Sequence, residues 1–309
     1  MKMTNRRESS NIEDRRRGRK TRAAAGGIGG LSIVGILLYF VLSGGNVSPA
    51  VVAQLSGANG GTQPSDNTQA GPVQTTDSAF YKNNADFENE EALRSFIAQV
   101  LGSTEDIWTT IFQKAGKKYQ MPKMVVFSQE TTSGCGKALS NMGPFYCPVD
   151  QTVYLDLNFL ATMKKQLGAD GDFAFAYVIA HEVGHHVQYL TGELAKYQTM
   201  EHKLKEAGKK AEANLVSVQI ELEADCYAGL WGRYEQAMFK SLESTDFMEA
   251  FHAAKSVGDD TLGNTHRDTF SHGSAKMRQA WFKTGFEGSD MSVCNTYQYA
   301  SLDALENKQ

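Results

Sequence analysis

The sequence predicts an α+β fold: a helix-rich domain with a small β-sheet near its start, preceded by a single transmembrane helix. Apolar residues recur at helical spacing through much of the chain beyond residue 90, which predicts the helices. Two short β-branched or alternating runs, residues 124–127 and 152–157, lie between turn-forming residues and predict strands. The 309-residue chain has no charged residue between Arg22 and Asp66, and an apolar run in this stretch predicts the membrane helix.

Residues 1–22 are predicted to be a basic cytoplasmic leader on an otherwise acidic chain. The leader holds nine Lys and Arg against three Asp and Glu, whereas the whole chain has a net charge of −4. The remaining 287 residues therefore carry a net charge of −10. This acidic body argues against a nucleic-acid-binding protein, whose folded part would concentrate positive charge.

Residues 23–43 are predicted to be a transmembrane anchor. A helix over the run 23–42 would be about 30 Å long, which matches the hydrocarbon thickness of a bilayer. Basic residues flank only its N-terminal side, so the positive-inside rule predicts a single-pass inner-membrane protein with its body in the periplasm or otherwise outside the cytoplasm. The lipid bilayer is thus a predicted partner. A cleaved signal peptide with its apolar core at residues 31–42 is the alternative, and it delivers the body to the same compartment.

Residues 44–79 are predicted to be a flexible linker, because six Gly, three Pro and only two charged residues leave little to bury. The folded domain is predicted to span residues 80–309. It begins with two short helices, at residues 93–101 and 107–115. Further helices are predicted at residues 173–190, at residues 211–239 and after Ser274, with a polar helical stretch between the first two that breaks at Gly208.

The predicted helix 173–190 carries the motif His-Glu-Val-Gly-His at residues 181–185. His181 and His185 lie about 40° apart on one helix face, so both imidazoles can bind one ion. Glu182 lies beside that face, where a general base for a metal-activated water belongs. Two buried structural histidines beside a surface glutamate are the alternative. The apolar neighbours disfavour it, because burying these groups without a metal is costly. His186 is interpreted as a packing residue or as a partner behind the ligands.

A catalytic zinc ion needs three protein ligands and one open position. The residues after His185 hold no Gly or His in the register of the metzincin motif, so the third ligand lies elsewhere. In the predicted helix 211–239, Glu221 and Asp225 share one face, whereas Glu223 points away. We expect Glu221 to bind the zinc ion and Asp225 to accept the N–H of a ligating histidine. An acidic solvated helix face is the alternative, and the apolar neighbours disfavour it.

The pattern H-E-x-x-H followed by E-x-x-x-D is typical of gluzincin metallopeptidases, and the chain resembles the YpfJ-like family of bacterial neutral zinc metallopeptidases. The resemblance spans residues 80–300 together with the leader and the anchor. It rests on residues 134–136, 143–148, 180–188, 221–229 and 270–286. It implies a zincin-like fold, one Zn²⁺ per chain, a peptide or protein substrate and a single membrane pass.

Residues 271–278 resemble a second signature, T-H-P-x-x-x-x-R, of the HtpX and CAAX-prenyl-protease family of membrane gluzincins. His272 and Arg278 match its His and Arg, while Gly273 stands where that family has Pro. The resemblance implies that His272 and Arg278 face the cleft and stabilise the tetrahedral intermediate, where a developing oxyanion needs a donor. The alternative is a helix N-terminus capped by a nearby serine, with Arg278 paired on the surface.

The four cysteines contain no C-x-x-C pair, which argues against a thiolate zinc site and a thioredoxin-like redox motif. Because the body is predicted to lie outside the cytoplasm, we expect the cysteines to pair. Cys135 and Cys147 bracket a turn-rich loop and are the preferred bridge, which leaves Cys226 and Cys294. Four cysteines allow three pairings, and buried free thiols are the alternative.

Together these features predict a membrane-anchored zinc-dependent peptidase. The predicted zinc ligands are His181, His185 and Glu221. Glu182 is the predicted general base, and His272 is the predicted hydrogen-bond donor to the oxyanion. A non-catalytic zinc-bearing scaffold or partner-binding protein of the cell envelope is one alternative, and it would close the metal with a fourth protein ligand. A zinc hydrolase of a non-peptide amide is another, and it would share the same site.

Overall fold

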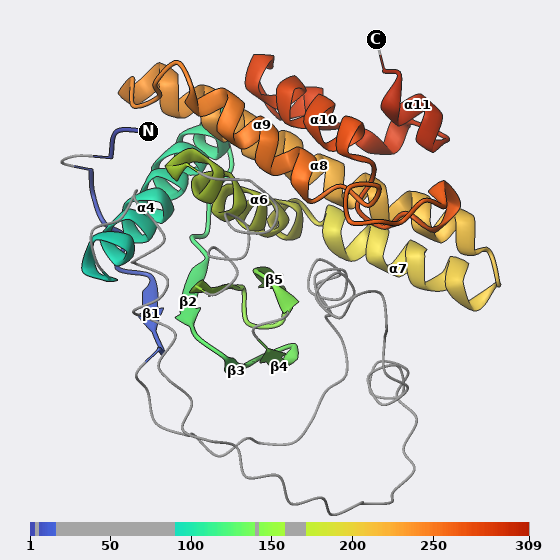
Figure 1. Cartoon of the computed structure of the whole chain (residues 1–309), viewed down its shortest axis with the longest axis horizontal. Helices are drawn as coiled ribbons and strands as arrows, with labels where there is room; N and C mark the ends of the chain where they lie inside the picture. Colours follow the sequence, from blue (N-terminus) through green and yellow to red (C-terminus); the bar gives the residue numbers. More distant parts are fainter. Residues whose placement is uncertain (4–5, 17–89, 140–141, 158–170, 309) are drawn as a thin grey trace, which may run out of the picture.

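The computed structural model describes residues 1–3, 6–16, 90–139, 142–157 and 171–308 (Figure 1). The predicted anchor at 23–43 and the predicted linker at 44–79 lie outside these residues. Among the residues that are described, no helix is both long enough and apolar enough to cross a membrane.

Helices make up most of the described chain, and a small sheet comes early, which confirms the α+β class. The helices are α4 (Glu90–Lys114), α6 (Asp172–Thr191), α7 (Glu193–Glu206), α8 (Lys210–Phe239), α9 (Asp246–Ser256), α10 (Ala275–Glu287) and α11 (Leu302–Glu306), with short 3-10 turns η2 (Arg267–Thr269), η3 (Met291–Cys294) and η4 (Thr296–Gln298). The strands are β1 (Ile12–Asp14), β2 (Lys123–Phe127), β3 (Glu130–Ser133), β4 (Gly136–Leu139), β5 (Phe145–Cys147) and β6 (Thr152–Asp156).

The main sheet has the strand order β1-β2-β6-β5, with β1, β2 and β6 parallel and β5 antiparallel to β6. Side chains alternate between the two faces of a strand, and both faces of β2 are covered. Met124 and Val126 join the main core with the helices, whereas Val125 and Phe127 join a smaller cluster beneath the β3–β4 hairpin. The disulfide between Cys135 and Cys147 ties this hairpin to the sheet.

Helix α4 corrects the prediction of two short helices at residues 93–101 and 107–115. It runs unbroken for 25 residues, through Ser103 and Thr104, which lie between the two predicted helices. The Thr104 hydroxyl donates to the backbone carbonyl of Leu101, and the Ser103 hydroxyl donates to the Glu235 carboxylate. Both polar groups are therefore satisfied within a continuous helix.

Residues 1–3 and 6–16 pack against the body, although the sequence predicted a leader separate from the folded domain. Strand β1 pairs with β2 from Ile12↔Met124 to Asp14↔Val126 (Figure 1). Met1 and Met3 are buried in the main core. The part of the leader that the structure describes is thus an edge strand and a core segment of the domain.

Helix α8 is central to the domain and packs against α6, α7 and α10. Glycines make the closest approaches possible. A Cβ atom at Gly184 of α6 would lie 3.0 Å from the backbone oxygen of Ala224 on α8. A Cβ atom at Gly285 of α10 would lie only 1.8 Å from the backbone oxygen of Cys226. These glycines bring α6 and α10 within reach of the side chains of α8.

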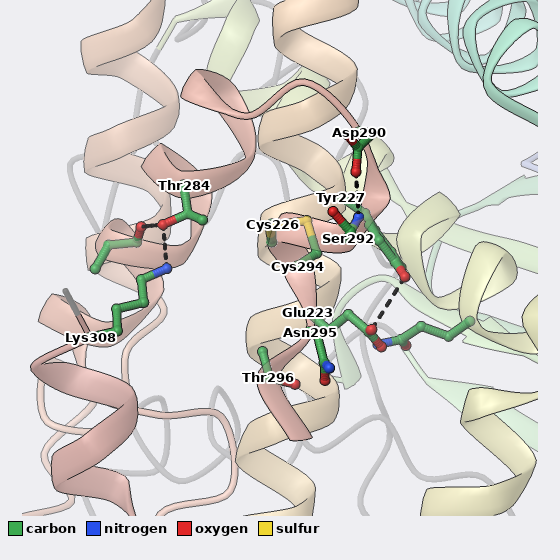
Figure 2. The surroundings of a disulfide bond; sticks show 12 residues. Glu223, Cys226, Tyr227, Thr284, Asp290, Ser292, Cys294, Asn295, Thr296 and Lys308 are labelled. Atoms are coloured by element: carbon green, nitrogen blue, oxygen red, sulfur yellow. Dashed lines mark hydrogen bonds between the residues drawn. A yellow bond between two sulfur atoms is a disulfide. The ribbon is translucent and has the colours of Figure 1, made fainter. Parts of the chain in front are cut away.

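The second predicted bridge, between Cys226 and Cys294, is also present and joins α8 to η3 (Figure 2). It closes a loop with a sequence separation of 68 residues. All four cysteines of the chain are thus paired, as the sequence analysis expected.

Candidate metal centre

Three side chains from two helices converge at one point of the domain. His181 and His185 come from α6 and Glu221 from α8, and their possible ligand atoms all lie within 4.8 Å of one another. Nε2 of His181 lies 3.3 Å from Oε2 of Glu221, and Nε2 of His185 lies 3.6 Å from Oε1. The i, i+4 spacing on α6 aligns the imidazoles, and the bare backbone of Gly184 lets α8 approach them.

Hydrogen bonds behind the imidazoles fix which nitrogen faces the centre. Nδ1 of His181 lies 2.8 Å from Oδ1 of Asp225, and a carboxylate only accepts, so this nitrogen donates. Nδ1 of His185 lies 2.8 Å from Oε1 of Gln188, whose amide nitrogen donates elsewhere. In the neutral tautomers both Nε2 atoms therefore present lone pairs toward Glu221. Three acceptors that face one another are held together only by a cation.

The donor set fits Zn²⁺. Two imidazoles and one carboxylate are a ligand set of catalytic zinc sites, which keep a fourth position open. Oε2 of Glu221 is buried, and within the described ranges no hydrogen-bond donor reaches it, so a cation would satisfy it. No fourth His, Cys, Asp or Glu among the described residues joins the cluster. That arrangement disfavours the closed structural site that a zinc-bearing scaffold requires.

The electrostatics of the cluster favour a positive charge at its centre. Burial lowers the pKa of His181, but Asp225 and Glu221 outweigh burial and raise it from 6.5 to about 9. Burial raises the pKa of Glu221, but the two imidazoles and His272 outweigh it and hold that pKa well below its usual value. Burial also raises the pKa of Glu182, against the pull of the imidazoles.

Asp225 is the centre of a buried network behind His181. Oδ1 accepts from Nδ1 of His181 and from the hydroxyl of Tyr177, at 2.8 and 2.5 Å. Arg278 donates to the same carboxylate through Nε at 2.8 Å and Nη2 at 2.9 Å. Arg278 and His181 outweigh burial and lower the pKa of Asp225. The carboxylate is thereby held ionised, which fixes the tautomer of His181.

Arg278 does not take the place that the second resemblance implied. Its side chain is 2% exposed, and its remaining Nη1 donates to the backbone oxygen of Val257 at 3.1 Å. The guanidinium therefore anchors Asp225 and is not free to face a substrate carbonyl. The surface ion pair of the alternative interpretation is equally wrong, although Ser274 does cap α10 by accepting from the backbone N–H of Met277.

Gln188 is a functional residue that the sequence analysis missed. It is fully buried one helical turn beyond His185 and accepts from that imidazole. Its amide nitrogen donates to the backbone oxygen of Ile220 and to Glu223, both at 2.8 Å. These two acceptors fix the orientation of the amide, and the amide in turn fixes His185. The i, i+3 spacing from His185 was the available signal.

His272 lies close enough to Glu221 for its charge to lower the pKa of that carboxylate. Asp259 holds it: the carboxylate accepts from the backbone N–H groups of residues 271–273 and lies 3.3 Å from Nδ1 of His272. Nε2 of His272 is buried and finds no partner in the described part of the chain. Gly273 has a φ of 92°, which Pro cannot adopt, so the departure from the family signature has a backbone cause.

Comparisons with known proteins identify the family of the chain. A family model described as "Putative neutral zinc metallopeptidase" matches residues 1–297. The chain belongs to this family of neutral zinc metallopeptidases. It is 42% identical to "Uncharacterized protein YpfJ" of Escherichia coli (strain K12), over 96% of this chain and 99% of that protein. It is 41% identical to "Uncharacterized protein Rv2575" of Mycobacterium tuberculosis (strain ATCC 25618 / H37Rv), over 60% of this chain and 65% of that protein. No solved structure matches the chain.

In this chain His186 faces away from the candidate metal ligands and links α6 to the sheet. Nε2 donates to the backbone oxygen of Gln120 at 2.6 Å, and Nδ1 accepts from the hydroxyl of Tyr146 at 2.9 Å. The ring is fully buried, and burial lowers its pKa from 6.5 to about 4. His186 is thus the packing residue that one of its two sequence interpretations proposed.

We expect His186 to destabilise the folded protein in acid. The folded protein resists protonation of the ring, so the free energy of unfolding falls as the pH drops from about 6.5 to about 4, by of order 3 kcal/mol. His186→Gln removes this titration. Urea unfolding of both metal-free proteins between pH 7 and pH 4 measures the difference. If the free energy of unfolding falls equally in the two proteins between pH 7 and pH 4, His186 is not the group responsible.

Glu223 points away from the metal ligands, as the helical spacing predicted, and it is buried. The hydroxyl of Tyr227 donates to one of its oxygens (Figure 2). The other oxygen accepts from the hydroxyl of Tyr297 and from the amide of Gln188. Burial and the carboxylate of Glu193 outweigh these donors and raise its pKa to about 8. Glu223 therefore anchors Gln188, which connects η4 to the metal ligand His185.

Proposed function

We propose that this metallopeptidase hydrolyses peptide bonds with one Zn²⁺ held by His181, His185 and Glu221. The observation that carries the proposal is the convergence of the Glu221 carboxylate with two imidazoles whose Nδ1 atoms are already engaged. When bound, Zn²⁺ lowers the pKa of a water molecule to about 7 and polarises the scissile carbonyl. A zincin-like catalytic domain is part of this proposal.

Glu182 is proposed as the general base. It neighbours His181 on α6, is 5% exposed, and senses the charges of both imidazoles. Burial raises its pKa, which makes the carboxylate a stronger base than an exposed glutamate. Glu182 takes the proton of the attacking water and passes it to the departing amine. His272, held by Asp259, is proposed to donate from Nε2 to the developing oxyanion.

The cellular location is a further part of the proposal. Two disulfides engage all four cysteines, and such bonds persist in oxidising compartments. This supports a catalytic domain outside the cytoplasm. Membrane attachment through residues 23–43 is proposed from the sequence alone.

Removal of the metal tests the function. We expect the purified full-length chain to contain one Zn²⁺ and to cleave casein or a peptide library. A chelator should abolish cleavage, and added Zn²⁺ should restore it, because the attacking water is activated only by the ion that His181, His185 and Glu221 would hold. Metal analysis beside the assay links the two changes. Full cleavage by the metal-free chain would contradict the proposal, and cleavage of only non-peptide amides would favour the alternative hydrolase.

A further inference from the structure

Two carboxylates outside the candidate metal centre are completely buried. Glu105 lies on α4 and Glu235 on α8, and both side chains are 0% exposed. A buried carboxylate without a partner is strongly destabilising. The hydrogen-bond donors and cations that contact these two carboxylates therefore show which parts of the chain must be present when the domain folds.

The hydrogen-bond donors found on Glu105 in the described ranges all come from residues 6–16. Arg7 donates through Nη2 at 2.8 Å, the hydroxyl of Ser9 at 2.6 Å and the amide of Asn11 at 2.7 Å. These residues alternate along the segment, so an extended backbone turns all three toward one side. Every one of these donors is lost if the segment is elsewhere.

Arg6 pairs with Glu235 in the same way. Its Nη1 lies 2.9 Å from the carboxylate, and its guanidinium lies 3.3 Å from the centre of the Phe239 ring. The hydroxyls of Ser103 and Ser241 also donate to Glu235, but they carry no charge. Among the described residues, Arg6 supplies the positive charge that this buried carboxylate requires.

A glycine inside α4 lies against the backbone of the leader. A Cβ atom at Gly102 would lie 2.5 Å from the backbone oxygen of Arg7. Glycine within a helix costs roughly 0.5–1 kcal/mol relative to alanine, so it needs a reason. The backbone of the leader passes directly over this position, and the backbone N–H of Ser9 donates to the oxygen of Ala98 at 2.9 Å.

We propose that residues 1–3 and 6–16 are an integral part of the metallopeptidase domain and lie on the same side of the membrane as the described part of that domain. Four observations support this placement: strand β1 on β2, the donors on Glu105, the charge on Glu235, and the glycine beneath Arg7. The family match also includes these residues, since it begins at residue 1. The proposal stands apart from the catalytic function and holds whether or not the site cleaves peptides.

This placement differs from the topology that the charge pattern predicts. A single crossing at residues 23–43 would put the leader in the cytoplasm and the domain outside, and Arg6 and Arg7 could not then reach Glu235 and Glu105. A cleaved signal peptide would remove strand β1 and leave both carboxylates without these partners. The buried contacts therefore favour an uncleaved leader that stays with the domain.

Cysteine labelling of the full-length chain in intact cells tests the topology. All four native cysteines are in disulfides, so an engineered thiol is the target of a membrane-impermeant maleimide. Lys2→Cys reports the leader and Lys205→Cys reports the domain, because the two lysine side chains are 72% and 54% exposed. We expect both variants to be labelled in intact cells, or both only after lysis. Labelling of one before lysis and the other only afterwards would overturn the proposal.

Thermal unfolding of the purified full-length chain tests whether the leader stabilises the domain. Arg7→Met should lower the unfolding midpoint by about 5–10 °C, because Glu105 loses its cation. The double variant Arg7→Met with Glu105→Gln should regain at least half of that shift, since the buried charge is gone. Lys2→Met, which removes an exposed pair with Glu243, is the matched control and should leave the midpoint unchanged. An Arg7→Met protein that unfolds at the wild-type temperature would overturn the proposal.

Discussion

Glu182→Gln is expected to retain one Zn²⁺ per chain and to lower kcat for peptide hydrolysis by about 100- to 10,000-fold. Glutamine keeps the size of the side chain and the three metal ligands, but it cannot take a proton from water. Metal analysis and a steady-state peptide assay on the same preparation measure both quantities. The loss should fall on kcat and not on KM, because the general base acts in the transition state.

Two further variants distinguish loss of the general base from loss of a zinc ligand and from a change at the surface. Glu221→Gln should lose zinc and activity together, because Glu221 contributes one of three ligands. Glu206→Gln on α7 replaces a carboxylate that is 67% exposed, and it should change neither quantity. Glu182→Gln with a kcat within threefold of wild type would remove Glu182 from the mechanism.

Arg278→Met is expected to reduce the free energy of unfolding of the metal-free protein by about 3–5 kcal/mol. The substitution leaves the carboxylate of Asp225 buried without its two guanidinium hydrogen bonds. Urea unfolding after removal of zinc measures the effect without a contribution from the metal. A residue that only stabilised the transition state would show no such loss.

The control for this prediction lies on the same helix. Lys276→Met removes a side chain that is 66% exposed and pairs with Glu306 at 3.6 Å, so its cost should be below about 1 kcal/mol. Adding Asp225→Asn to Arg278→Met should restore part of the stability, because the buried charge disappears. Equal stabilities of Arg278→Met and Lys276→Met would contradict the anchoring role of Arg278.

The metal cluster could be predicted from the sequence because helical spacing decides it locally. His181 and His185, like Glu221 and Asp225, lie one turn apart on their own helices, and the period of the α-helix places each pair on one face. That the two pairs meet was inferred from the number of ligands that zinc requires. The close approach of α6 and α8 at Gly184 allows the two pairs to meet. Gln188 obeys the same spacing and could have been found.

The leader and Arg278 could not be predicted, because their partners are distant in sequence. Strand β1 is short and carries two acidic residues, so neither its length nor its pattern indicates a strand. Its neighbour β2 lies more than a hundred residues further along the chain. An arginine after a helix N-terminus is usually exposed, and only the buried Asp225, 53 residues earlier, explains why Arg278 is inside.

The bridge between Cys226 and Cys294 has a consequence for anyone who purifies this protein. The 68-residue interval that it closes contains α9, Asp259, His272 and the whole of α10. A single proteolytic cut anywhere in that interval leaves both fragments covalently joined. Such a sample runs as one intact band on a gel without reductant and as two bands after a thiol is added, so cleavage here is visible only when the two lanes are compared.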